Sequence, residues 1–430
     1  MMLDKMFHLR ENQTDVKTEI MAGITSFMTM AYILAVNPGI LAAAGMDQGA
    51  VFTATALAAF ISTLCMALFA NYPFALAPGM GLNAYFAYTV VLGMGYSWRV
   101  ALAAVFAEGL LFILLSLFHV REAIFHAIPS NLKKAVSVGI GLFITFIGLD
   151  SFQGKGITVL LAVIGVIVTG ILMVRNIKGN ILWGILITWG LGILCQMAGL
   201  YVPNEELGIY SLIPDFSGGI SVPSLAPVFG KMSLDGITVL EFIVVVFAFL
   251  FVDIFDTLGT LIGVSSKAGM LDEEGKLPHI RGALLADAVG TTAGAVLGTS
   301  TVTTFVESAS GVSEGGRTGL TALTTGFLFL LSLFLSPVFL AIPSFATAPA
   351  LIIVGFYMLS AVTEINFSDA SEGIPAFICI VAMPFFNSIS EGIAMGVISY
   401  VIINLLSGNR KKVGSMMAGL AVLFLMKYIM

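Results

Sequence analysis

Apolar runs follow one another along almost the whole chain, separated by short polar stretches. Ten of them are long enough to cross, or nearly cross, the roughly 30 Å hydrocarbon core of a bilayer as helices. They begin near residues 20, 50, 98, 131, 156, 179, 237, 318, 347 and 389. Four shorter or interrupted runs lie at 74–93, 281–298, 299–312 and 373–387. The pattern predicts an all-α polytopic membrane protein with fourteen transmembrane segments.

The basic residues favour this larger segment count. With a cytoplasmic N-terminus, fifteen of the nineteen Lys and Arg residues fall in inner loops, as the positive-inside rule requires. Removing any one short segment would invert every later loop and place basic clusters outside. We therefore expect a multi-pass protein of the cell membrane with both termini in the cytoplasm. Residues 413–430 are expected to form an interfacial helix.

Composition agrees with this class. The chain is 58% hydrophobic and only 10% charged, whereas soluble domains carry about 25% charged residues. The net charge of −6 says little, because the charges of such a chain lie in loops and follow topology, and no feature supports nucleic acid as a partner; the lipid bilayer is the expected surrounding. Three cysteines and four histidines are scattered without metal-ligand spacing, so neither a metal site nor a cofactor is expected.

The fourteen segments divide into two sevens at the long polar loop from Tyr201 to Gly236. An odd number in each half forces opposite orientations, which predicts a 7+7 inverted repeat. The stretch from Tyr32 to Pro38 is echoed weakly by the stretch from Phe251 to Asp256. Prolines and glycines between 73 and 81 interrupt the third segment, and glycines at 298 and 311 interrupt the tenth. Paired interrupted segments of this kind indicate a transporter's binding site.

Short extended pieces are predicted inside the two interrupted segments. Thr301 to Val306 is β-branched and aromatic, a composition that favours extended chain over helix. Extended backbone within a membrane must be paired internally, and Phe74 to Leu76 could supply the partner strand. Two half-helices would then begin near a central cavity, with Glu307 at the junction.

Four carboxylates lie where an apolar membrane helix should have none: Asp253, Asp256, Asp287 and Glu307. Each costs roughly 2.5 to 3.5 kcal/mol at mid-bilayer depth on insertion scales, so such groups usually face a cavity and mark a substrate or proton path. Helical spacing puts Asp253, Thr257 and Thr260 on one polar stripe, with Asp256 beside it. The chain is therefore expected to be a secondary transporter.

The polar groups suit a nucleobase. A buried carboxylate at Glu307 can accept hydrogen bonds from ring or exocyclic N–H groups, and Asn83 offers both a donor and an acceptor. Glycines at 290, 294 and 298 form a ridge at four-residue spacing, which glycines at 259 and 263 repeat, and close helix packing is enough to explain both sets.

Three sequence motifs carry a resemblance to a known family: Ala77 to Phe86, Asp253 to Thr260, and Gly298 to Ser308. In this order they resemble the AzgA-like branch of the nucleobase:cation symporters, over essentially the whole chain. The resemblance implies a proton-coupled purine permease for hypoxanthine, guanine or adenine, with the uracil-permease fold. It also implies a homodimer.

The resemblance also implies a division into domains. A core domain would comprise residues 20–118 and 237–336, and a gate domain residues 131–200 and 347–408. Residues 1–19 would form a cytoplasmic tail, residues 201–236 an extracellular loop, and residues 409–430 a cytoplasmic or interfacial tail. Alternating access would arise between core and gate.

Site roles follow from the same resemblance. The substrate would meet Asn83, Asp253 and Glu307, and we add the neighbours Thr304 and Phe305. The proton step or the support of the site would fall to Asp256 and Asp287, and we add Asn37 and Thr257 to this supporting set. The family's uracil branch has a histidine in the eighth segment, and none occurs here, so its proton chemistry does not transfer unaltered.

Three other classes of membrane protein are alternatives. A transporter of the same fold that moves anions would need a cationic or neutral site, which the four acidic residues oppose. An intramembrane enzyme is disfavoured because no serine/histidine, paired-histidine or metal constellation appears in the predicted spans. A channel is the last alternative. The expected function is import of purine nucleobases by proton symport, not enzymatic catalysis.

Overall fold

The computed structural model describes residues 2–117, 128–150, 152, 156–203, 210–216, 221–267, 269–270, 277–278 and 280–429. Its elements are mostly helices joined by short connections. The first half contains α1 Met2–Phe7, α2 Val16–Met30, α3 Ile33–Ala43, α4 Gln48–Phe69, β1 Leu76–Pro78, α5 Met80–Ala84, a π-helix Tyr85–Gly93, α6 Trp98–Leu117, α8 Ser130–Asp150, α9 Ile157–Val174 and α10 Asn180–Met197.

The second half contains α11 Val239–Lys267, α12 Ile280–Leu297, β2 Val302–Thr304, α13 Ser308–Ser313, α14 Gly319–Leu331, a 3-10 turn Ser332–Leu335, α15 Ser336–Leu340, α16 Ser344–Leu359, a 3-10 turn Ser360–Glu364, α17 Ala370–Phe385, α18 Ile389–Leu406, a 3-10 turn Arg410–Lys412 and α19 Ser415–Ile429. Several helices begin where a side chain satisfies free backbone N–H groups. Asp15 accepts from two of them at α2, and Asp47 from one at α4.

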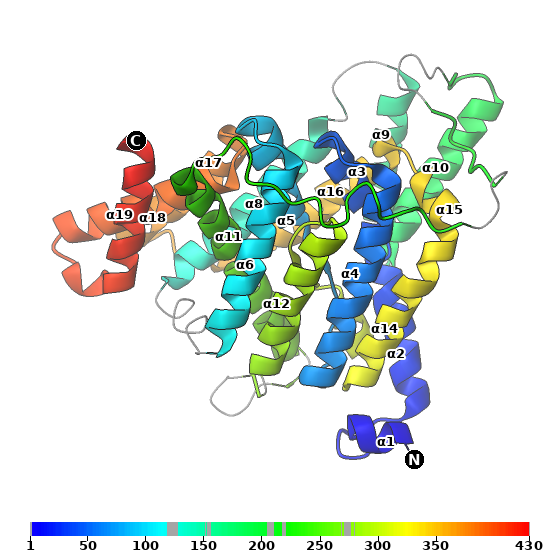
Figure 1. The fold of residues 1–430 in the computed structure, drawn as a ribbon, viewed down its shortest axis with the longest axis horizontal. Helices are drawn as coiled ribbons and strands as arrows, with labels where there is room; N and C mark the ends of the chain where they lie inside the picture. The colour runs from blue at the N-terminus through cyan, green and yellow to red at the C-terminus, as the bar shows by residue number, and fades with distance from the viewer. Residues whose placement is uncertain are drawn as a thin grey trace.

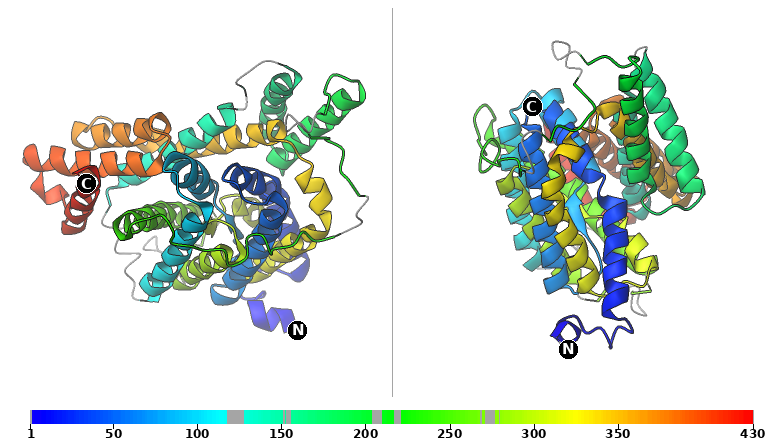
Figure 2. Two further views of the ribbon diagram at one scale, coloured as in Figure 1. Left: turned by 45° about the horizontal axis from the view of Figure 1, so that its top comes forward. Right: turned by 90° about the vertical axis from the view of Figure 1, so that its right-hand side faces the viewer.

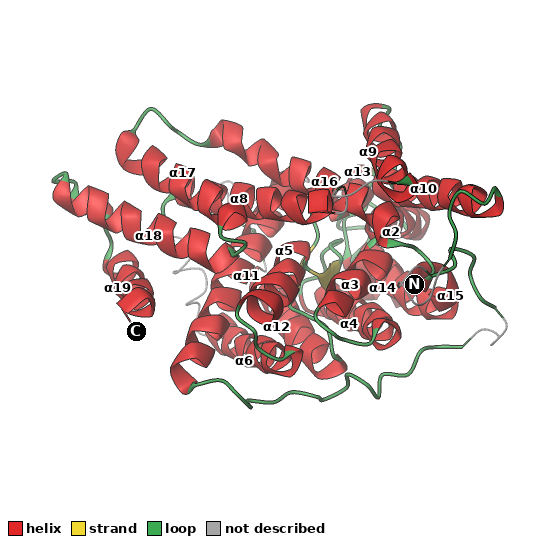
Figure 3. Cartoon of the chain, turned by 90° about the horizontal axis from the view of Figure 1, so that it is seen from above, coloured by secondary structure: helices red, strands yellow, loops and turns green. Residues whose placement is uncertain are grey.

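The helices pack in two groups (Figure 1). A strand-bearing group contains α2–α6 and α11–α14 with both strands, and α12 lies against α4 and α6 within it. A flanking group contains α8–α10 and α16–α18, in which α8 packs against α16 and α17. Seen from above, the flanking helices lie along one side of the other group, and the strands sit near the middle of the molecule (Figure 3). The views of Figure 2 show the same separation. The assignment of these groups as core and gate domains stays a prediction.

The structure supports a helical polytopic membrane protein. Among the described residues, ten helices are long and apolar enough to cross a membrane, by length and composition. One of them is α12, so the expectation that 281–298 is a short or broken segment was wrong: its small residues let it continue unbroken between α4 and α6. The other predicted segments correspond to α11, to the two strand-bearing stretches and to the shorter α17. Fourteen crossings in a 7+7 inverted repeat stay a prediction.

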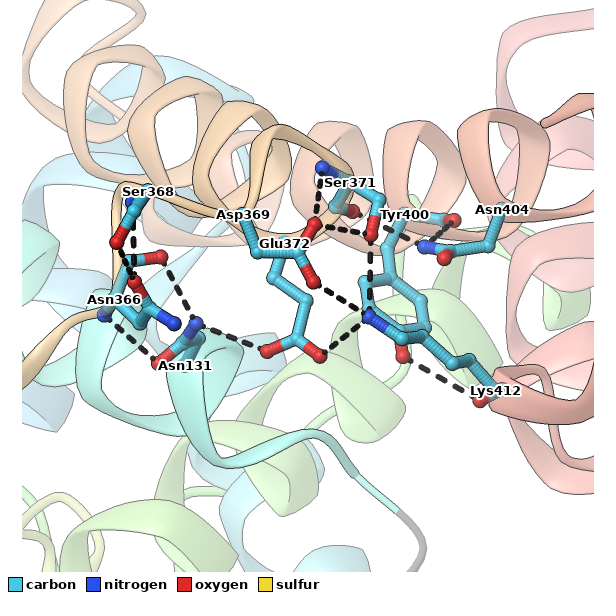
Figure 4. A network of polar contacts seen from close by, with 9 residues as sticks. All are labelled: Asn131, Asn366, Ser368, Asp369, Ser371, Glu372, Tyr400, Asn404 and Lys412. Atoms are coloured by element: carbon cyan, nitrogen blue, oxygen red, sulfur yellow. Dashed lines mark hydrogen bonds and ion pairs between the residues drawn. The ribbon is translucent and has the colours of Figure 1, made fainter. Parts of the chain in front are cut away.

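A polar network ties one end of the flanking group to the C-terminal segment (Figure 4). The Lys412 ammonium donates to Asp369 at 2.7 Å and to Glu372 at 3.1 Å, and Asn131 of α8 donates to the second oxygen of Glu372 at 2.9 Å. Hydrogen bonds from Lys412 and Ser371 hold the pKa of the Asp369 carboxyl down at about 2. The network therefore joins α8 and α17 to the short turn before α19.

The C-terminal helix α19 packs on α18 and on α11 of the strand-bearing group. The ring of Phe424 meets those of Phe247 and Phe251, each with centroids 6.3 Å apart and nearly perpendicular planes. A helix is thus present where one was expected in 413–430. Its position at the membrane interface stays a prediction.

Candidate functional site

Two short strands pair at the centre of the site, and we call this pair the strand crossing because it joins the two interrupted segments. β1 and β2 pair antiparallel, with Leu76 opposite Thr304 and Pro78 opposite Val302. The expected partner strand, Phe74 to Leu76, was placed two residues too early, because strand pairing centres on Ala77. The Gly79 N–H continues the pairing by donating to the Thr301 carbonyl at 3.0 Å. A side chain at position 79 would lie 2.5 Å from the Thr303 methyl group, so the close approach requires glycine.

A cavity of about 640 Å³ lies beside this crossing, within the range of small-molecule sites. Its lining comes from both helix groups, including α8 and α16 of the flanking group. Its buried end is lined by Tyr32, Asp256, Thr303, Thr304, Phe305 and Glu307. At the other end are Lys133, Lys134 and Glu364, the last with a 66% exposed side chain. The cavity thus runs from an acidic buried end to a charged, exposed mouth.

Glu307 stands where the extended chain of β2 gives way to α13. The Tyr32 hydroxyl, at the break between α2 and α3, donates to Glu307 Oε1 at 2.7 Å. Thr29 Oγ1 also contacts the Glu307 carbonyl at 3.4 Å. The Glu307 side chain is partly exposed to the cavity, as is that of Asp256. No hydrogen bond to Asp256 or to Glu307 Oε2 occurs within the part of the chain that the structure describes, so three carboxylate oxygens remain as acceptors for a ligand.

Asp253 and Asp287 lie behind the cavity wall, fully buried. Thr257 Oγ1 contacts Asp253 Oδ1 at 2.8 Å, Asp287 Oδ1 at 2.9 Å and Thr303 Oγ1 at 2.9 Å. Thr303 in turn lines the cavity. One hydroxyl carries a single proton, so Thr257 cannot donate to both aspartates at once. Because a hydroxyl can donate one hydrogen bond while it accepts others, this arrangement can pass a proton between the cavity wall and the two buried carboxylates.

The predicted polar stripe on α11 is divided by its surroundings. Asp253 and Thr257 point into the buried network, whereas Asp256 and Thr260 line the cavity. Asp256, expected in a supporting role, is thus the α11 carboxylate that a ligand would meet, and Asp253 does not line the cavity. The functional role of each stays a prediction.

The two asparagines among the predicted residues hold the chain that leads into β2. Asn83 accepts a short hydrogen bond from the Ser300 hydroxyl. Asn37 donates to Thr299 at 2.9 Å and to Thr55 at 2.7 Å. Neither asparagine is among the cavity-lining residues. Both therefore brace the strand crossing from behind.

Thr304 and Phe305 lie on the cavity wall, as their predicted role requires. The Thr304 hydroxyl is buried and has no hydrogen-bond partner within the described residues. Buried polar groups are rarely left unpaired, but this oxygen has almost no exposed surface and does not itself face the open cavity. Phe305 offers its aromatic ring beside it.

The spacing of the α11 glycines predicted close helix packing, and for these two residues that prediction was wrong. Around Gly259 and Gly263 an added Cβ would meet no atom within 4 Å, and both residues line the cavity. They leave space for a ligand. Gly290 fits the packing prediction, because a Cβ there would lie 2.4 Å from Ser62 of α4.

Two residues near the strands escaped sequence reasoning. Tyr32 bonds Glu307, and its only signal was the weak echo between Tyr32–Pro38 and the α11 motif. Glu108 is fully buried on α6 and accepts from Thr301 Oγ1 at 2.8 Å. A carboxylate within an apolar helix was the same signal that identified the other four.

Comparison with known proteins places the chain among transporters. The model of the Permease family (Xan_ur_permease) matches residues 17–395. A putative permease of Methanocaldococcus jannaschii is 49% identical, with 99% of this chain and 98% of that protein aligned. The guanine/hypoxanthine permease PbuO of Bacillus subtilis is 44% identical, covering 97% and 98%. The adenine permease AdeQ of Escherichia coli is 41% identical, covering 100% and 96%.

The fold also has solved counterparts. The transmembrane domain of the cyanobacterial bicarbonate transporter BicA superposes with a TM-score of 0.65 and 15% sequence identity, covering 88% of this chain and 97% of that one. At this identity the likeness concerns the fold alone. It agrees with a helical polytopic membrane fold.

Proposed function

Since this chain belongs to the Permease family, we propose that it imports purine nucleobases by proton symport across the cell membrane. Its membership makes it a multi-pass membrane transporter rather than an enzyme. Relatives named as guanine/hypoxanthine and adenine permeases support purines as the substrate class.

One observation carries the substrate assignment: the acidic, partly apolar buried end of the cavity. Three free carboxylate oxygens on Asp256 and Glu307 are acceptors, which match the N–H groups on the edge of a purine. Phe305 offers a ring against which a flat base can stack.

The charge of the buried end favours a neutral or protonated ligand over an anion. Two carboxylates face the space a ligand would occupy, and like charges at close range raise the free energy of binding. We assign the coupled proton to the Asp253–Thr257–Asp287 network, which reaches the cavity through Thr303.

Transport requires the two helix groups to move relative to each other. The cavity is lined by both of them, so a relative displacement would open or close it. Its mouth carries Lys133 and Lys134, which the positive-inside rule assigns to the cytoplasm. We therefore infer an inward-facing conformation, with both termini cytoplasmic. The homodimer stays a prediction from the resemblance.

Uptake into proteoliposomes tests the proposal. Labelled hypoxanthine, guanine and adenine are offered with and without an inward proton gradient. We expect accumulation that requires the gradient, competition by purine bases, and weak competition by inosine, whose ribose does not fit the buried end. Glu307→Gln should weaken uptake, whereas Glu314→Gln, an exposed glutamate paired with Lys178, should not. Accumulation of bicarbonate without purine transport would overturn the proposal.

A further inference from the structure

Tyr32 touches the candidate site in a way that the substrate assignment does not use. It lies in the break between α2 and α3, is 1% exposed, and contributes to the cavity lining. Its hydroxyl donates to Glu307 Oε1 at 2.7 Å, across 275 positions of the sequence. Thr29, in the last turn of α2 before the break, contacts the Glu307 carbonyl. The end of α2 and the break together therefore hold Glu307 by both its backbone and its side chain.

This contact makes the two oxygens of Glu307 unequal. Oε1 already accepts a charge-assisted hydrogen bond from a phenol, which is stronger than a neutral one. Oε2 has no such partner in the described residues. A ligand that presents one N–H group finds Oε2 unengaged. A ligand that presents two neighbouring N–H groups must place the second on Oε1, where the Tyr32 hydroxyl already uses one of the two lone pairs and fixes the direction of the other.

Purine bases differ in the number of neighbouring N–H groups that they present on one edge. Guanine carries an exocyclic amino group next to its ring N–H, whereas hypoxanthine has the ring N–H alone. A carboxylate with both oxygens free can accept two parallel hydrogen bonds from such a pair of donors. Tyr32 reduces that advantage because it already donates to one of the two oxygens.

We propose that Tyr32 is a specificity-determining residue that limits the preference of the site for guanine over hypoxanthine. The inference rests on the proposed function, because it takes Glu307 as the acceptor for a purine. Tyr32 acts by engaging one oxygen of Glu307 rather than by touching the base. Removing its hydroxyl frees Oε1 for the guanine amino group.

The test is the ratio of guanine to hypoxanthine affinity in wild type and in Tyr32→Phe, measured by competition in purified protein and by uptake in proteoliposomes. The phenylalanine keeps the ring and its packing. We expect the ratio to rise about tenfold, which corresponds to about 1.4 kcal/mol. A purely structural role for Tyr32 would weaken both bases equally and leave the ratio unchanged.

Two further variants isolate the contact. Tyr400→Phe removes a buried hydroxyl that lies outside the cavity lining and donates to the Lys412 carbonyl at 3.4 Å, and the ratio should stay as in wild type. In a Glu307→Gln background, Tyr32→Phe should no longer change the ratio, since the freed carboxylate oxygen is absent. An unchanged ratio in Tyr32→Phe, or an equal change in the Glu307→Gln background, would overturn the inference.

The same experiment separates the two levels of the proposal. If wild type binds neither guanine nor hypoxanthine, the proposed function fails. If wild type binds and transports both but Tyr32→Phe leaves their ratio unchanged, only the role of Tyr32 fails.

Discussion

Thr257 offers the most direct test of the buried network, because one hydroxyl joins two carboxylates to the cavity wall. Its oxygen lies 2.8 Å from Asp253, 2.9 Å from Asp287 and 2.9 Å from Thr303. Thr257→Val keeps the shape of the side chain and removes only the hydroxyl. Thr257→Ser keeps the hydroxyl and removes a methyl group, so the two variants separate hydrogen bonding from packing.

The expected magnitude follows from counting protons. The hydroxyl donates to one carboxylate at a time, a bond worth about 1.5 to 3 kcal/mol, and shares a neutral bond with Thr303 worth about 0.5 to 1.5 kcal/mol. Thr257→Val should therefore lower the free energy of unfolding by about 2 to 4.5 kcal/mol. Thr257→Ser should cost about 1 kcal/mol, the value of one buried methyl group.

Two assays report on the variants. Thermal unfolding of the purified protein in detergent should rank stability as wild type, then Thr257→Ser, then Thr257→Val. Purine accumulation driven by a proton gradient should persist in Thr257→Ser and fall sharply in Thr257→Val, because the link between the cavity and the aspartates is lost. If Thr257→Val unfolds at the wild-type temperature and accumulates purine normally, the hydroxyl neither holds nor connects the carboxylates.

Other consequences can be tested separately. Asp253→Asn should abolish accumulation against a gradient while purine binding persists, because an amide cannot exchange the coupled proton; normal pH-dependent accumulation would reassign that role to Asp256 or Asp287. Gly263→Leu should fold normally but block the cavity in a binding assay, whereas Gly290→Leu should lower the unfolding temperature by its clash with α4. A cysteine at position 215, in a background without Cys65, Cys195 and Cys379, should be labelled from outside the cell; labelling only from the cytoplasm would break the fourteen-segment topology. The contact of Lys412 with ionised Asp369, which lowers the pKa of that carboxyl from 3.8 to about 2, stabilises the fold fully above pH 3.8, and this contribution is lost as the pH falls towards 2. The difference in stability between wild type and Lys412→Met should therefore shrink over that range.

The sequence by itself determined the features that depend on local composition. The cost of placing polar groups in a bilayer shows directly as apolar runs, so the class and the approximate helix bounds were readable. The same cost made Asp253, Asp256, Asp287 and Glu307 stand out. β-branched residues before Glu307 predicted the extended piece that became β2, because such side chains favour extended backbone regardless of what pairs with it.

Only the tertiary structure decided which of these groups face one another. Asp253 and Asp256 are three residues apart on one helix, and the rotation of α11 against its neighbours puts one in a buried network and the other on the cavity. The pairing register of β1 and β2, and the bond from Tyr32 to Glu307 across 275 positions, depend on the packing of distant segments. Periodicity defines the faces of each helix, but the facing partner is set by side-chain contacts between segments, which local composition does not encode.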